Sequence, residues 1–142
     1  YGSAIPREIN KKEDINLSEI EPSEEGIVSR HHVAEIIEAR MEEIFSMVNK
    51  ELKSIGREKL LPAGVVLTGG TAKMPGVVDL AKNILALPSQ TGFPTLLGGL
   101  IDKVDDPSFA TSVGLILWGL DNLNYSKKGN PNKNKIVNIH EK

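Results

Sequence analysis

Residues 65–76, VVLTGGTAKMPG, decide the fold of this chain. Residues 65–67 are a continuous apolar run, which is typical of a parallel strand that is covered on both faces. Gly69 and Gly70 follow at once, and because glycine has no Cβ the chain can turn sharply there and approach a ligand closely. Pro75 suits the first turn of a following helix. The stretch therefore predicts a strand, a glycine turn and a helix, the repeating unit of an α/β fold.

A turn of this kind lies at the carboxyl end of its strand, where open α/β sheets bind ligands. The unpaired N–H groups at the start of the following helix point outward from it. The same two glycines also suit a tight turn that only packs a helix onto a sheet. On spacing alone this packing explanation is the more common one, so a nucleotide site needs support from the rest of the chain.

The clearest helix is predicted before this unit, over residues 30–55. Its apolar residues recur every three or four positions and form one stripe, which consists of Val33, Ile37, Met41, Ile44, Val48, Leu52 and Ile55. Ser29 stands where an N-cap is expected, and Gly56 stands where a glycine ends a helix. Residues 1–28 predict a small charged antiparallel sheet with one face exposed, in which residues 14–20 alternate as a strand.

The chain after the glycine turn is expected to close the folded part. Residues 88–94 should include an edge strand, and residues 95–106 form a loop. Asp106 and Pro107 predict a helix start, with Asp at the cap and Pro at the first helical position. The helix that follows is nearly apolar and is therefore expected to be largely buried. From residue 122 the composition shifts to Asn and Lys, which predicts a flexible polar tail.

Composition excludes several classes of function. The chain has 142 residues, enough for one domain of ordinary size, and its net charge of −2 gives no general attraction to nucleic acid. It has no cysteine, which rules out disulfides and thiolate metal sites and fits a reducing compartment. No apolar run reaches the roughly 18–20 residues of a membrane-spanning helix. His31 and His32 do not predict a metal site, because adjacent residues on a helix face different directions.

Several motifs together resemble a known family. The apolar strand, LTGGTAKMPG at 67–76 and the following helix resemble the adenosine motif of the superfamily of actin, sugar kinases and heat-shock chaperones. Within it, RHHVAEIIEARMEEIFSMVNKELKSIG at 30–56 and DDPSFATSVGLILWGL at 105–120 resemble the FtsA family of bacterial cell-division proteins. The opening YGSA and PREI match it as well, so the resemblance covers residues 1–121.

This resemblance implies an α/β fold, namely a partial actin-like (ribonuclease-H-like) lobe with a small α+β outer subdomain. Residues 1–56 would form the outer subdomain, residues 57–121 part of the inner subdomain with the adenosine-motif loop, and residues 122–142 the polar tail. Because the chain begins with Tyr1 and matches only the end of such a lobe, we expect a C-terminal piece of the second lobe of a longer protein.

FtsA proteins bind ATP with Mg²⁺, with weak or no turnover, and link filaments of the tubulin-like protein FtsZ to the membrane. They polymerise themselves and contact other division proteins. The resemblance therefore implies a cytoplasmic adaptor at the inner face of the cell membrane at the division site. It favours a protein that is not a turnover enzyme. The family's membrane anchor is a C-terminal amphipathic helix, which residues 122–142 do not contain. Two alternatives stay open: a piece of another ATPase of the superfamily, and a packing module without a ligand.

The family's nucleotide site carries over only in part. Gly69, Gly70 and Thr71 match the turn that passes the purine and the α-phosphate. Met74 matches the position beside the adenine face, although a hydrophobe that caps the next helix explains it equally well, and the role of Lys73 stays open. The family's phosphate-binding hairpins, of the form DxGxxx, and its Mg²⁺-associated acidic residues have no match in this chain. We therefore expect the chain to bind ATP weakly or not at all.

The family's partner site implies a second set of residues. The C-terminal peptide of FtsZ, which carries carboxylates and apolar anchors, docks on the long helix and the strands beside it. His32, Ile36 and Arg40 follow one another at spacings of four, with Arg30 just before them, and they offer cations beside an apolar side chain. Arg40 is also placed to pair with Glu43 on the same helix, and a solvated helix face explains the pattern without a partner.

Overall fold

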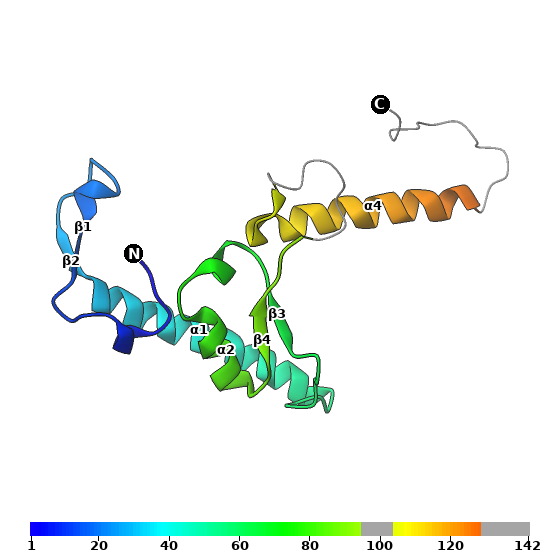
Figure 1. The fold of residues 1–142 in the computed structure, drawn as a ribbon, viewed down its shortest axis with the longest axis horizontal. Helices are drawn as coiled ribbons and strands as arrows, with labels where there is room; N and C mark the ends of the chain where they lie inside the picture. The colour runs from blue at the N-terminus through cyan, green and yellow to red at the C-terminus, as the bar shows by residue number, and fades with distance from the viewer. Residues whose placement is uncertain (95–103, 129–142) are drawn as a thin grey trace.

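The structure is a computed structural model that describes residues 1–94 and 104–128 (Figure 1). In these residues, short 3-10 helices, labelled η, and three-residue strands alternate with three α-helices. In chain order the described elements are η1 (Pro6–Glu8), β1 (Asp14–Asn16), η2 (Leu17–Glu19), β2 (Ile27–Ser29), α1 (Arg30–Ser54), β3 (Val65–Leu67), η3 (Gly70–Lys73), α2 (Val77–Leu85), β4 (Ser89–Thr91), η4 (Pro107–Phe109) and α4 (Ala110–Lys128). Most of the predicted loop at 95–106, and the end of the predicted tail, lie outside the described residues.

Helix α1 has the predicted extent and the predicted caps. The Ser29 side chain accepts a hydrogen bond from the backbone N–H of His32, and Gly56 has a φ of +65° that favours glycine. The Gly56 N–H donates to the Lys53 carbonyl, at 3.0 Å, which satisfies one of the open carbonyls at the helix end. The predicted apolar stripe is only partly covered, because its last residue, Ile55, is exposed.

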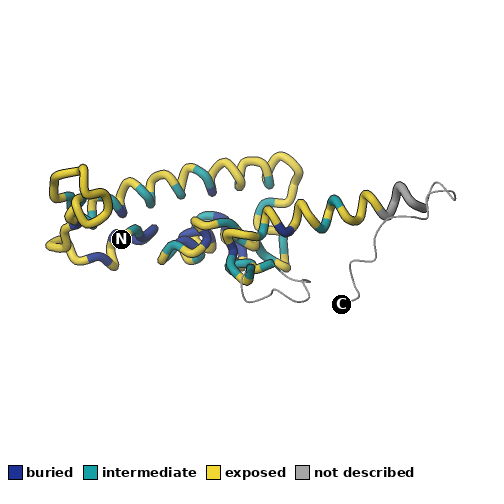
Figure 2. Tube along the Cα trace, turned by 90° about the horizontal axis from the view of Figure 1, so that it is seen from above, coloured by how far each residue is buried: buried dark blue, intermediate teal, exposed yellow. Residues whose placement is uncertain are grey.

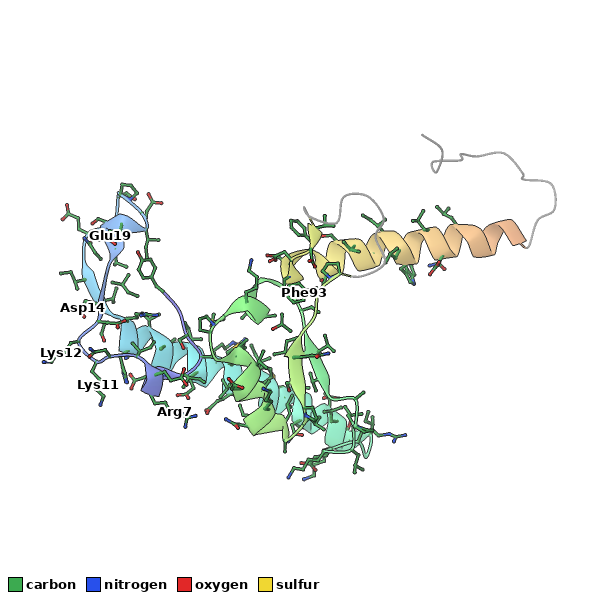
Figure 3. The ribbon with its side chains drawn as sticks, in the orientation of Figure 1. Arg7, Lys11, Lys12, Asp14, Glu19 and Phe93 are labelled. Carbon is green, nitrogen blue, oxygen red and sulfur yellow. The ribbon has the colours of Figure 1, made fainter. Side chains whose placement is uncertain are left out.

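The antiparallel hairpin of β1 and β2 confirms the small sheet that residues 1–28 predict. Ile15 on β1 is buried and Ile27 on β2 is exposed, so one face is wet. The predicted strand over 14–20 is too long, because the Asn16 side chain accepts hydrogen bonds from the Ser18 N–H and turns the chain into η2. Charged side chains gather at this end of the molecule, where Figure 3 labels Arg7, Lys11, Lys12, Asp14 and Glu19.

The glycine stretch forms the predicted strand–turn–helix unit. Strands β3 and β4 pair in parallel, with Val65 opposite Ser89 and Leu67 opposite Thr91, and α2 connects them. Helix α2 begins at Val77 and not at Pro75, because Gly76 takes a left-handed φ of +81° and turns the chain into the helix.

The hydrophobic core lies between α1, α2 and one face of this sheet. Figure 2 shows the buried positions gathered beside α1 and around α2. The buried members are Ala4, Phe45, Val77, Leu80, Ala81, Leu85 and Leu87. Val65 and Leu67 pack against this cluster, whereas Val66 is 53% exposed. The prediction that this strand is covered on both faces is therefore wrong for the described residues, because they pack against only one face.

Helix α4 differs most from the expectation. Asp106 caps its start as predicted, since its side chain accepts from the Ser108 N–H at 2.9 Å. The prediction of a largely buried helix is wrong. Its large apolar side chains are mostly more than half exposed, namely Leu115, Ile116, Trp118, Leu120 and Leu123. The reason is its placement: α4 extends away from the remaining elements in both Figure 1 and Figure 2. It also continues through residues 122–128, into the segment expected to be a polar tail. None of the helices in the described part of the chain is long and apolar enough to cross a membrane.

Candidate functional site

A depression of about 410 Å³ lies beside the glycine turn. It is lined by side chains and backbone from the turn and from the beginning of the chain, namely Tyr1, Gly2, Gly70, Thr71, Lys73, Met74 and Pro75. Three of the four predicted nucleotide residues, Gly70, Thr71 and Met74, therefore border one space. Gly69 lies in the same turn but does not line the depression.

The turn itself is held by backbone hydrogen bonds. Gly69 has a φ of +89°, and its N–H donates to the Pro107 carbonyl at 2.9 Å, so this N–H is engaged with the start of η4. The Ala72 N–H donates to the Gly69 carbonyl at 3.1 Å, and the Met74 N–H donates to the Thr71 carbonyl at 3.0 Å. Gly69 thus acts by shaping the turn, because a left-handed φ is readily adopted only by glycine.

Met74 contributes to two environments at once. It packs against the hydrophobic core cluster and it also lines the depression. It does not lie on the following helix, since it is the residue that ends η3 and precedes α2. Met74 therefore contributes both to the core and to the wall of the depression.

Lys73 has a defined partner at the rim of the depression. Its Nζ donates to Oδ2 of Asp106 at 2.8 Å. The hydrogen bonds from Lys73 and from Ser108 lower the pKa of Asp106 from 3.8 to about 2. Lys73 is half-exposed, so an anion in the depression would compete with Asp106 for this ammonium.

The predicted partner residues separate into two groups. His32, Ile36 and Arg40 lie along α1 at spacings of four, with exposed fractions of 68%, 59% and 63%. His32 Nδ1 lies 3.1 Å from Oε2 of Glu35, one turn along the helix. Arg40 forms an ion pair with Glu43, which is the alternative that its spacing suggested.

Arg30 does not belong to this exposed row. Its NH1 pairs with the Glu13 carboxylate, and its Nε donates to the Tyr1 carbonyl at 2.9 Å. Arg30 is therefore engaged within the chain, apart from the exposed row, and its contact with a partner stays a prediction. Tyr1 and Gly2 were not predicted at the depression, because their approach to the turn depends on tertiary packing.

Comparisons with known proteins identify one family. The sequence model of a family described as "Cell division protein FtsA" matches residues 1–114. The chain is similar to Cell division protein FtsA of Pseudomonas aeruginosa, with 40% identity over 120 residues that cover 84% of this chain and 29% of that protein. The protein of the same name from Neisseria meningitidis is 48% identical over 90 residues, which cover 63% of this chain and 22% of that protein. The one from Bacillus subtilis is 38% identical over 121 residues, which cover 85% and 26%. The chain thus spans between about a fifth and a third of the length of these relatives.

Proposed function

The chain belongs to the FtsA family of cell-division proteins, and from that premise we propose that it supplies a docking surface for the C-terminal peptide of FtsZ and one wall of an ATP site. The exposed row of His32, Ile36 and Arg40 on α1 supports the proposal most strongly. The family match favours FtsA over the alternative that the chain is a piece of a chaperone or sugar kinase from the same superfamily.

The α1 row suits a peptide that carries both carboxylates and apolar anchors. Ile36 offers an apolar contact between the His32 imidazole and the positively charged Arg40 guanidinium. Arg40 can meet a peptide carboxylate with two parallel N–H bonds, which lysine cannot do. Its present partner, Glu43, is exposed, and an exposed ion pair contributes little stability, so a peptide carboxylate can replace it.

A charge reversal tests this surface. We expect Arg40→Glu to weaken binding of an FtsZ C-terminal peptide about tenfold, because one charge-assisted hydrogen bond is lost and a repulsion is added. Lys50→Glu makes the same charge change on an exposed residue of the same helix and should leave the affinity within about twofold. Fluorescence anisotropy with a labelled peptide measures both variants. Equal effects of the two variants would assign the change to net charge and move the docking site away from Arg40.

The depression beside the glycine turn suits the adenosine part of ATP and not its phosphates or metal. Gly70 lacks a Cβ, and Met74 offers a polarizable apolar side chain that suits a purine face. None of the lining residues that the structure describes is acidic, so this part of the depression offers no carboxylate for Mg²⁺. The family's phosphate-binding hairpins and Mg²⁺-associated acidic residues also have no match in this sequence, so ATP with Mg²⁺ would depend on groups outside this chain.

The remaining family properties follow from the same premise. We propose that the longer protein acts in the cytoplasm, at the inner face of the cell membrane at the division site, and that it associates with itself in filaments and with other division proteins. Attachment to the membrane would use a C-terminal amphipathic helix of the family, for which residues 122–142 have no matching pattern. Cosedimentation of the longer protein with lipid vesicles, with and without FtsZ, tests this part of the proposal.

A further inference from the structure

The segment 1–5 crosses from the glycine turn to α1, and it is largely buried along this path. The Ala4 N–H donates to the Pro75 carbonyl at 2.9 Å, and Ala4 is fully covered by the core. Ile5 lies against Gly76 so closely that a Cβ at Gly76 would come within 2.5 Å of Ile5 Cγ1. The segment is therefore fastened to the turn at residues 75 and 76.

Its other end is fastened to the start of α1. Arg30 Nε donates to the Tyr1 carbonyl at 2.9 Å, while Arg30 NH1 pairs with the Glu13 carboxylate. The Tyr1 hydroxyl donates to Oε2 of Glu19, at 3.3 Å, but this bond is exposed and holds only the end of the side chain. Arg30 therefore makes the bond from α1 that holds the backbone of Tyr1.

Gly2 lies between these two ends and contacts both sides. A Cβ built on Gly2 would lie 3.1 Å from Ile37 Cδ1, on α1, and 3.8 Å from Met74 Cε, on the turn. Tyr1 and Gly2 also line the depression beside the turn. The position of this wall of the depression is thus set jointly by α1 and by the turn.

We infer that Arg30 is a positioning residue that fixes the Tyr1–Gly2 wall of the depression from helix α1. Unlike His32, Ile36 and Arg40, it does not contact the docked peptide. The inference rests on the proposed function only for the identity of the ligand in the depression. A partner carboxylate that recruited Arg30 would first have to displace both Glu13 and the Tyr1 carbonyl.

The test compares variants that remove different bonds of Arg30 in the full chain. Arg30→Ala removes both the bond to the Tyr1 carbonyl and the pair with Glu13. Glu13→Gln is the matched control, because it removes the ionic partner and leaves the Tyr1 carbonyl bond in place. The readout is the nuclear Overhauser effect (NOE) between the Gly2 Hα protons and the methyl groups of Ile37 and Met74.

We expect Arg30→Ala to reduce these NOEs to less than half while the chemical shifts of the buried Leu85 methyl groups stay unchanged. Glu13→Gln should keep the NOEs at their original intensity. Arg30→Lys should retain part of the intensity, because an ammonium group can donate to the Tyr1 carbonyl but lacks the planar fork that reaches Glu13 as well. If Arg30→Ala fails to fold, this Lys variant decides the matter. Equal losses in Arg30→Ala and Glu13→Gln, or no loss in either, would overturn the inference.

A titration with AMP separates this inference from the proposed nucleotide site. If the Thr71 amide resonance of the unmodified chain shifts saturably at millimolar AMP, Arg30→Ala should weaken the affinity on the order of threefold and Glu13→Gln should not. An unchanged AMP affinity in Arg30→Ala would count against the positioning role. If AMP causes no shift in the unmodified chain, the adenosine assignment of the depression fails, while the NOE comparison still decides the role of Arg30.

Discussion

The outer face of α1 and the depression beside the glycine turn are built in different ways. The α1 row lies on one helix whose ends are capped by its own neighbours, Ser29 and Gly56. The depression draws its walls from the turn and from Tyr1 and Gly2, and none of its described lining residues is acidic. A surface carried by one capped helix depends on local structure, whereas a site assembled from distant segments needs every segment in place. The difference indicates that partner docking is the more self-contained of the two proposed functions.

The largest expected change in stability is at Gly76, where Ile5 packs against the glycine turn. Gly76→Ala places a Cβ 2.5 Å from Ile5 Cγ1 in a residue with a φ of +81°, and should lower the free energy of unfolding by about 2–3 kcal/mol. Urea unfolding measures the change. Gly56→Ala is the matched control, because its φ of +65° is also positive but nothing lies within 4 Å of the added Cβ, so about 1 kcal/mol is expected. Equal losses in the two variants would mean that the packing of Ile5 on the turn contributes little.

A smaller effect is expected at the start of α1. Ser29→Ala removes the N-cap that accepts from the His32 N–H, and should cost about 1 kcal/mol in the free energy of unfolding. Ser29→Asp keeps a capping oxygen and should recover most of the loss. Because the first turn of α1 carries His32, fraying of this turn should also weaken peptide binding. An unchanged peptide affinity in Ser29→Ala would place the docking site farther along α1.

The smallest effect concerns the ion pair at the rim of the depression. The pKa of Asp106 is lowered to about 2, so the folded state favours the ionised carboxylate, and this stabilisation is present above about pH 4. It should be lost as the pH falls from about 4 toward 2, when the carboxylate takes up a proton. Thermal unfolding across this pH range should show a smaller acid loss in Asp106→Asn than in Asp105→Asn, its exposed neighbour. The same slope in both variants would contradict the role of the Lys73 pair.

Local signals predicted the backbone well. The order of apolar residues, Gly and Pro in 65–76 predicted strand, turn and helix, because glycine readily takes a positive φ and proline fixes its own φ. Ser29 and Gly56 predicted the ends of α1, because a Ser side chain accepts from an open N–H and glycine readily takes the left-handed φ that ends a helix. Asp106 and Pro107 predicted the start of the last helix, although it opens with a 3-10 turn before α4.

Burial and distant contacts were harder to predict. Val66 and Trp118 are apolar, and apolar character predicts that a residue can be covered, not which element covers it. Asn16 ended its strand early through its own side chain, against the alternating pattern. The bond from Arg30 to the Tyr1 carbonyl joins two residues that no sequence pattern relates. The sequence therefore grouped Arg30 with the other predicted partner residues on α1 and gave no sign of this bond.

Calorimetric titration of this one chain with two ligands tests the central claim most directly. We predict measurable binding of an FtsZ C-terminal peptide that Arg40→Glu weakens, and weak or no binding of ATP, because the described lining of the depression offers an adenosine wall without a carboxylate for a metal. Micromolar binding of ATP, or no binding of the peptide to the folded chain, would contradict it.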